Sequence, residues 1–583
     1  MTITEALQIA QRVPATAPKF QVKLACGFTP LHLQTFLTAH VQQRLPGRKI
    51  ATVPGLYGDL AGTIENVAAG DGDRPDCLAM VLEWPDLDPR LGFRSSGSWS
   101  AAAISDILSS ARAMLARIVD TLSRIPAGIR MAAMLPSLPL PPMFHTSGWQ
   151  ASEEELILQR DLLAMASELA RGLRVVIVNG QLLAERSPAA NRFDLKTDLL
   201  TGLPYSVQHA SEVAAALALA LFPPTPKKGI ISDLDDTLWS GIVGEIGPEN
   251  VSWDLASHHQ LHGLYQKSLA SLSENGILVG IASKNDPAVV QKTFERPDLL
   301  IPAERIFPFE VHWEAKSGSV SRILHTWNIA ADSVIFVDDS PMECAEVAAA
   351  HPGIECICFP KGDYAAGLAM LRRLRDLCGK ERISKEDTLR LDSIRRSAEF
   401  QQHTAAGSAS EEFLQQLNAT VSIDFHCGSE SRTLELVNKT NQFNLNGIRL
   451  TEADWQNRLA QPGAFVAGLS YEDKFGMLGT IAVIQGFERQ DVLHISTWVM
   501  SCRAFARRIE HRCLAVLFDR YQANYIEFDF AATAKNGPVQ DFLTAILGRS
   551  PCPPVRIACQ QFQTMCPSLY QTVREVRRTE TNG

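Results

Sequence analysis

The chain has 583 residues, which is too long for one hydrophobic core and predicts about three domains of ~100–200 residues each. Hydrophobic residues make up 46% of the chain and charged residues 20%, a composition typical of folded globular proteins. The net charge of -9 argues against broad nucleic-acid binding, because that function needs a basic surface.

Sequence features of membrane and secreted proteins are missing. We find no apolar run of about 18 residues, and the apolar stretch at 214–222 is too short for a membrane span. The first residues show no basic segment followed by an apolar one, as a signal peptide would. The 12 cysteines lack the spacing of zinc sites. We therefore expect a reduced, cytoplasmic protein without a membrane or nucleic-acid partner.

Between residues 20 and 221, short apolar segments alternate with helical patterns. Strands that alternate with helices are typical of a parallel sheet covered on both faces, so residues 1–222 are predicted to form a doubly wound α/β domain. We predict strands at 22–25, 50–53, 77–82, 130–135 and 175–178, and helices at 31–45, 105–122 and 153–169.

The first strand of this domain is followed by Ala25-Cys-Gly-Phe-Thr29. The domain resembles the SGNH hydrolase fold, whose enzymes carry a serine at that place and an Asp-x-x-His motif near the domain's end. Neither is present here, although His209 opens the last helical segment. The resemblance therefore implies a structural or docking domain, with a second hydrolase as the alternative.

After a proline-rich linker, the stretch 229–239 joins an apolar strand to a group of polar residues, Asp233, Asp235 and Thr237. Acids that follow a buried parallel strand lie at its carboxyl end, where open α/β sheets bind ligands. Two converging carboxylates repel each other unless a cation or a proton lies between them. Oxygen ligands suit Mg²⁺ bound beside a phosphate.

Three further motifs follow in a fixed order. Ser283 ends a second apolar run, Lys316 begins a helical pattern, and Asp338 and Asp339 end a third run. The four motifs together resemble the haloacid dehalogenase (HAD) superfamily. That resemblance implies that Asp233 is the nucleophile toward phosphorus and that Asp235 is the general acid/base. It also implies a phosphate site made of Thr237, Ser283, Lys284, Asn285 and Lys316, and an Mg²⁺ site made of Asp233, Asp235, Asp338 and Asp339.

The segment 233–247 closely resembles the FkbH-like branch of this superfamily, subfamily IIIC. Asp236 stands where that branch usually has Asn; its carboxylate either tightens metal binding or faces solvent, and we favour solvent. Too few residues separate the first two motifs for a large cap domain. We therefore expect an open site, suited to a macromolecular partner, in a HAD-like Rossmannoid domain over residues 223–370.

Residues 371–410 are rich in charged residues at helical spacing and predict a charged linker of one or two connecting helices. Residues 411–583 resemble the α+β GNAT acyltransferase fold. Its usual acyl-CoA loop has lost its small turn residues here, which leaves a phosphopantetheine arm as the candidate ligand. We predict strands at 421–425, 464–469, 477–484, 493–499 and 525–530, and helices at 433–438, 452–459, 539–547 and from 504.

Cys502 ends a predicted strand of this third domain, with Arg503 beside it. A thiol before a helix N-terminus and next to a cation is either an activated nucleophile or an inert buried cysteine. Stretches around both positions match the FkbH-like pattern. The resemblance places an acyl or pantetheine pocket at Asn441, Gln442, Asn444 and Arg503, and adds Cys502 to the catalytic residues.

FkbH-like proteins use 1,3-bisphosphoglycerate to load a glyceryl unit onto the phosphopantetheine thiol of an acyl carrier protein. The resemblance therefore implies a glyceryl transferase and phosphatase for polyketide or related biosynthesis. Three alternatives stay open: a stand-alone phosphatase on another phosphoester, loading of a different three-carbon unit such as lactyl, and a scaffold with a vestigial site.

Overall fold

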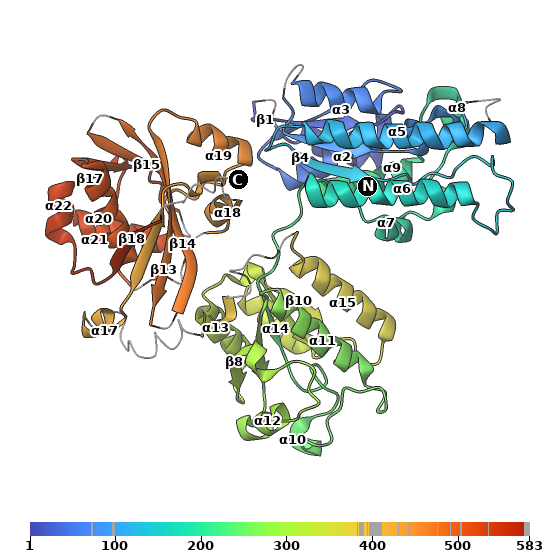
Figure 1. The fold of residues 1–583 in the computed structure, drawn as a ribbon. Helices are drawn as coiled ribbons and strands as arrows, with labels where there is room; N and C mark the ends of the chain where they lie inside the picture. The colour runs from blue at the N-terminus through green and yellow to red at the C-terminus, as the bar shows by residue number, and fades with distance from the viewer. Residues whose placement is uncertain are drawn as a thin grey trace. The chain divides into compact units, whose positions relative to one another are not determined.

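The computed structural model divides the chain into two compact units, Met1–Thr225 and Pro226–Gly583. Three β-sheets with flanking helices make up these units, so the predicted α/β class is confirmed (Figure 1). Among the described residues, none of the helices is both long and apolar enough to cross a lipid bilayer. The structure describes residues 1–14, 16–70, 74–95, 99–381, 383, 387, 390–392, 394–395, 411–429, 431–440, 442–474, 476–489, 491–501, 504–505, 507–533 and 536–576.

The first unit holds a parallel sheet of five strands in the order β2-β1-β3-β4-β5. Its strands are β1 Lys19–Ala25, β2 Lys49–Pro54, β3 Cys77–Val81, β4 Arg130–Met134 and β5 Val176–Ile177. Its helices are α1 Ile3–Gln11, α2 Leu31–Arg44, α3 Leu60–Ala69, α4 Trp84–Leu87, α5 Ile104–Ser123, α6 Glu153–Gly172, α7 Gly180–Arg186, α8 Leu195–Thr201 and α9 Val207–Leu221.

Both faces of this first sheet are buried. Alternate residues of β1 and β3 pack with α1, α2 and α9 on one face, and the residues between them pack with α3, α5 and α6 on the other. Burial on both faces explains why β3 is continuously apolar in sequence, whereas β1 alternates apolar residues with Lys19, Gln21 and Lys23. The five predicted strands and three predicted helices of this region are present, with shifts of a few residues at their ends.

The second unit begins with another parallel sheet, in the order β10-β9-β6-β7-β8. Residues 233–277, all described, contain only the short α10, α11 and isolated bridges, and hence no cap domain. The strands are β6 Gly229–Ser232, β7 Leu278–Ser283, β8 Ile306–Val311, β9 Val334–Asp338 and β10 Glu355–Cys358. The helices are α10 Val243–Ile246, α11 Gln260–Glu274, α12 Pro287–Phe294, α13 Lys316–Trp327, α14 Pro341–Ala350 and α15 Tyr364–Cys378.

Helix α15 lies where the charged linker was expected to begin. Met370, Leu374 and Cys378 of this helix are buried in the core that α11 forms with the second sheet. On the opposite face of the sheet, Ile394 is buried with Trp327 of α13. The predicted boundary between 370 and 371 therefore falls inside a helix that belongs to this sheet, because its apolar stripe outweighs its charged face. Residues 396–410 of the predicted linker lie outside the described residues.

The third sheet is mixed, in the order β17-β16-β15-β14-β13-β11-β18, with β12 paired to β15. Helices α20 to α22 cover one face, and α18 and α19 cover the other. The strands are β11 Thr420–Asp424, β12 Phe443–Asn444, β13 Ala464–Asp473, β14 Gly476–Arg489, β15 Val492–Met500, β16 Tyr525–Phe528, β17 Val555–Ala558 and β18 Thr572–Glu575. The helices are α17 Glu411–Gln416, α18 Ser431–Lys439, α19 Glu452–Leu459, α20 Ile509–Tyr521, α21 Gly537–Leu547 and α22 Cys559–Met565.

The helix predicted from residue 504 begins later, at Ile509. Arg508 is its N-cap and has a left-handed backbone with φ of 56°. A left-handed residue cannot continue a right-handed helix, so the helix begins only after it. The short β12 and the last two strands, β17 and β18, were not predicted.

Candidate active site

The candidate active site lies at the carboxyl edge of the second sheet. Strand β6 is bordered by β7 on one side and β9 on the other, so the chain reverses its direction of winding between β6 and β9. Open parallel sheets bind ligands at this reversal. Asp233 follows β6 directly, and Asp338 is the last residue of β9.

Three carboxylates meet at this edge. Oxygen atoms of Asp233, Asp338 and Asp339 all lie within 4.8 Å of one another, a grouping that could hold a metal ion. Asp233 and Asp338 are buried, and the backbone N–H of Ser340 donates a 2.9 Å hydrogen bond to Asp338 Oδ1. An all-oxygen set of this kind fits a hard cation and does not fit soft metals that prefer sulfur.

Lys316, the first residue of α13, brings a positive charge among these acids. Its Nζ lies 3.0 Å from Asp233 Oδ1, 2.5 Å from Asp338 Oδ2 and 2.5 Å from Glu343 Oε2. The Lys316 side chain is only 3% exposed, so water contributes little to screening these contacts. A buried lysine that touches carboxylates of the metal group is placed to neutralise the oxygens of a phosphoryl group bound there.

The pKa values of these groups follow from burial and from their neighbours. Burial, and to a lesser degree the charge of Asp338, raises the pKa of Asp233 to about 7, although Lys316 opposes this. Burial also raises the pKa of Asp338. Burial alone would lower the pKa of Lys316, but Asp233 and Asp338 hold it above its usual value. Lys316 is therefore cationic at neutral pH.

Asp235 does not join the three-carboxylate group. Its Oδ1 accepts hydrogen bonds from Trp239 Nε1 at 2.9 Å and from the Val243 backbone at 3.1 Å, and its Oδ2 accepts one from Asn285 Nδ2 at 2.8 Å. Alternation along a strand would point Asp233 and Asp235 the same way, but β6 ends at Ser232 and the chain turns. The predicted metal-ligand role of the Asp235 carboxylate is thus not supported by its position.

We expected Asp236 to face solvent, but its carboxylate contacts two partners in the protein. Its Oδ2 lies 2.9 Å from Lys361 Nζ, and its Oδ1 accepts a 2.7 Å hydrogen bond from the Gly241 backbone. Lys361 also forms an ion pair with Asp339, a member of the metal group. Asp236 itself has a left-handed backbone, with φ of 51°. Lys361 therefore links the unusual carboxylate to the candidate metal site.

The other predicted phosphate-site residues surround the same edge. Thr237, Ser283 and Asn285 are buried, and Thr237 Oγ1 lies 3.4 Å from Asp339 Oδ1. Asn285 Nδ2 lies 3.5 Å from Ser283 Oγ and is already bonded to Asp235. Lys284 instead pairs with Glu343 at 2.8 Å. The predicted residues thus lie together at this edge, and Lys284 is linked to the three carboxylates through Glu343 and Lys316.

Two residues of this network had no predicted role. Glu343 bridges Lys284 and Lys316, and Lys361 bridges Asp236 and Asp339. Glu343 lies in the first turn of the helix that follows β9, which is a signal available in the sequence. Lys361 follows β10 and meets Asp236 across 125 positions of sequence, so nothing local predicts the contact.

The candidate residues of the third sheet are only partly described. Asn441, Cys502 and Arg503 lie outside the described residues. Gln442 is exposed. Asn444 is buried, and its side chain accepts a 2.8 Å hydrogen bond from the Gly447 backbone and donates a 3.1 Å bond to Thr440 O. The Asn444 side chain thus stabilises the backbone on either side of it, from Thr440 to Gly447.

Comparisons with known proteins give weak similarities. A scan of family models and a search of curated proteins both give no match. The N-terminal part of BF1531 from Bacteroides fragilis, described as containing a phosphatase domain complexed with Mg, is 20% identical, with a TM-score of 0.49; the match covers 66% of this chain and 100% of that one. The S. aureus MnaA–UDP co-structure is 9% identical, with a TM-score of 0.16; the match covers 67% of this chain and 99% of that one. We base the function on the geometry above.

Proposed function

We propose that the second sheet carries an Mg²⁺-dependent phosphoryl-transfer site of the HAD type. The observation that carries this proposal is the meeting of Asp233, Asp338 and Asp339 with the buried Lys316 at the reversal point of a parallel sheet. Asp233, Asp338 and Asp339 would hold the ion. Mg²⁺ would neutralise phosphoryl oxygens there, and Lys316 would do so from the protein side.

The residues divide the reaction into two displacements. An oxygen of Asp233 attacks phosphorus, the bond from phosphorus to the ester oxygen breaks, and Asp235 gives the leaving alkoxide a proton. Asp235 then takes a proton from water, whose oxygen attacks phosphorus and releases phosphate from Asp233. The hydrogen bonds from Trp239, Val243 and Asn285 orient Asp235 for both proton transfers.

The substrate follows from chemistry joined to the FkbH-like resemblance. We propose 1,3-bisphosphoglycerate, which carries an acyl phosphate and a phosphate ester. Attack of Asp233 on the acyl phosphate would destroy the activated acyl group, whereas attack of a thiolate on the acyl carbon conserves it as a thioester and expels the acyl phosphate as inorganic phosphate. The HAD-type site therefore removes the 3-phosphate, and the glyceryl group passes to the phosphopantetheine thiol of an acyl carrier protein.

The thiol that first receives the acyl group is either Cys502 or the carrier's own. The exposed apolar side chains of Trp313 and Met342 favour a macromolecular partner, because each lies within a few residues of a site residue. Trp313 precedes Lys316, and Met342 precedes Glu343.

The test combines phosphate release with intact-mass spectrometry of a phosphopantetheinylated carrier protein, in the presence of Mg²⁺ and fresh 1,3-bisphosphoglycerate. We expect the carrier to gain a dephosphorylated glyceryl mass. Thiolate attack on the acyl carbon releases the acyl phosphate without Asp233, so Asp233→Asn should abolish only the release of the 3-phosphate and leave a phosphoglyceryl mass on the carrier. Asp332→Asn, which changes an exposed aspartate at the opposite end of the sheet, should leave release of the 3-phosphate intact. An enzyme adduct lost in Cys502→Ala would assign the first thiol. Phosphate release without carrier loading would leave a phosphatase, and neither product would overturn the proposal.

A further inference from the structure

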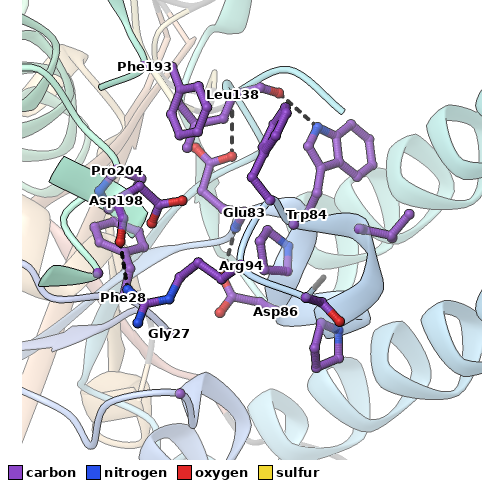
Figure 2. A pocket seen from close by; sticks show the side chains of 18 of the residues that line it. Gly27, Phe28, Glu83, Trp84, Asp86, Arg94, Leu138, Phe193, Asp198 and Pro204 are labelled. Atoms are coloured by element: carbon purple, nitrogen blue, oxygen red, sulfur yellow. Dashed lines mark hydrogen bonds between the residues drawn. The ribbon is translucent and has the colours of Figure 1, made fainter. Parts of the chain in front are cut away.

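A cavity of about 370 Å³ lies at the carboxyl edge of the first sheet (Figure 2). Its lining comes from the segments that follow β1, β2, β3 and β4, and from the region of α8. In the order β2-β1-β3-β4-β5 the winding reverses between β1 and β3, which is where open sheets bind ligands. The volume falls at the small end of the ~300–1,000 Å³ range of ligand pockets.

Aromatic side chains form much of the wall. Phe28, Trp84, Phe93 and Phe193 line the cavity, and the rings of Phe93 and Phe193 lie 5.0 Å apart. Tyr57 contributes a further ring at the more exposed side. Such walls bind the apolar body of a ligand, and the faces of the rings attract cations.

Asp198 brings a carboxylate to this apolar space. Burial raises its pKa, and the exposed guanidinium of Arg94 opposes that rise. The residue is 8% exposed, and Figure 2 shows its carboxylate directed into the cavity. Within the part of the chain that the structure describes, no hydrogen bond or ion pair reaches this carboxylate; its backbone carbonyl accepts bonds from Arg94 Nη1 at 2.6 Å and from the Gly202 backbone at 2.8 Å. A buried carboxylate without a partner costs free energy, and a bound cation would remove that cost.

Two more carboxyl groups line the same cavity. Asp86 accepts hydrogen bonds from the Glu83 backbone at 2.8 Å and from the Gly27 backbone. Glu83 accepts them from Tyr205 Oη at 2.6 Å and Ser137 Oγ at 2.8 Å. All of these donors are neutral, so they satisfy the oxygen atoms without balancing charge.

The position of Asp86 is built into the fold. A methyl group at Gly27 would lie 1.8 Å from Asp86 Oδ1, so only glycine at this place leaves room for the carboxyl group. Burial raises the pKa values of Glu83 and Asp86 to about 7 each, and it also raises that of Asp198. The elevated values reflect a pocket whose negative charge lacks a buried counterion.

We propose that this cavity binds a small organic ammonium ion that carries an apolar or aromatic group. The ammonium group would lie against Asp198 and Asp86, and the apolar body would lie among Phe28, Phe93 and Phe193. An anionic ligand would meet three carboxyl groups and one exposed guanidinium. A neutral alcohol would leave the Asp198 charge uncompensated. This site is separate from the phosphoryl-transfer proposal and stands or falls without it.

The test is calorimetric titration of the full chain with benzylamine, phenethylamine and tryptamine, each compared with the alcohol or carboxylate of the same shape. We expect at least one amine to bind about tenfold or more tightly than its alcohol, and the carboxylates not to bind. Asp198→Asn should weaken amine binding by a similar factor. Asp120→Asn, which removes the same charge from an exposed position on α5, should not.

Either of two results on the parent chain would overturn the proposal: no amine binds more tightly than its alcohol and its carboxylate, or no amine binds up to about 10 mM. Equal amine affinity in Asp198→Asn and the parent chain would do the same. Circular dichroism checks that the variant is folded; we expect no change, because the side chain of Asp198 makes no hydrogen bond among the described residues. The comparison of amines with alcohols on the parent chain decides the matter even if the variant is unstable.

Discussion

Replacing Lys316 by methionine tests the electrostatics of the candidate active site. The methionine keeps most of the apolar stem but removes the ammonium group. In the parent chain that group lies within 3.0 Å of Asp233, Asp338 and Glu343, and the side chain is 3% exposed. The substitution therefore leaves two buried carboxylates, Asp233 and Asp338, without their cation.

The expected loss is large. Removing one partner of a buried ion pair costs about 3–5 kcal/mol, because the remaining charge stays buried and unpaired. That is a substantial part of the ~5–15 kcal/mol by which domains are stable. Lys284→Met is the matched control, since Lys284 is 34% exposed and its ammonium group forms an ion pair with Glu343 at 2.8 Å. A partly exposed pair contributes below ~1 kcal/mol.

Hydrogen exchange followed by mass spectrometry measures this loss where it occurs, in peptides that contain β6 and β9. We expect faster exchange there in Lys316→Met, and partial recovery when Mg²⁺ is added, because the ion would compensate the same carboxylates. Peptides of the first sheet serve as an internal reference. Equal protection in Lys316→Met and the parent chain, or an equal loss in Lys284→Met, would refute the reasoning.

Three further substitutions have defined outcomes. Burial raises the pKa of Glu83 in the folded chain from 4.5 to about 7, so its contribution to stability is complete below pH 4.5 and is lost as pH rises to 7. Urea unfolding should show that the parent loses up to ~3 kcal/mol of unfolding free energy over that interval relative to Glu83→Gln. An equal dependence of the unfolding free energy on pH in both chains would contradict this. Gly280→Ala would place a methyl group 2.8 Å from the buried ring of Trp327 and should lower the unfolding free energy by about 1–3 kcal/mol; an unchanged urea midpoint would show that the ring can move. Lys361→Met removes a cation from a carboxylate of the candidate metal group, so calorimetry should show Mg²⁺ binding up to about fivefold tighter, since a half-exposed ion pair contributes ~1 kcal/mol; weaker binding would refute this.

The second sheet was largely predictable because its signals are local. Apolar runs that end in Ser283 or Asp338 predict parallel strands, and the carboxyl ends of parallel strands meet at one edge. The orientation of Asp235 was not predictable, because it depends on the turn that begins where β6 ends. The pairing of Asp236 with Lys361 was not predictable either, since it joins positions far apart in sequence.

The cavity of the first unit shows the same limit. Glu83 and Asp86 follow an apolar strand, a signal of the kind that indicated the second site. The residues that surround these two acids, among them Tyr205 and Asp198, come from segments far away in sequence. The sequence around Glu83 and Asp86 therefore does not predict that they are buried in a cavity. The domain boundary predicted at 370 falls within α15 for a related reason. The many charged residues of this helix suggested an exposed linker, although its apolar residues are buried against the second sheet.

The central claim is that Asp233 accepts a phosphoryl group beside a divalent cation. Beryllium trifluoride, which mimics a phosphoryl group on aspartate, tests this without a known substrate. We predict a bound ¹⁹F resonance that requires Mg²⁺, is lost in Asp233→Asn and persists in Asp332→Asn. A bound resonance in Asp233→Asn, or none in the parent chain with Mg²⁺, would contradict the claim.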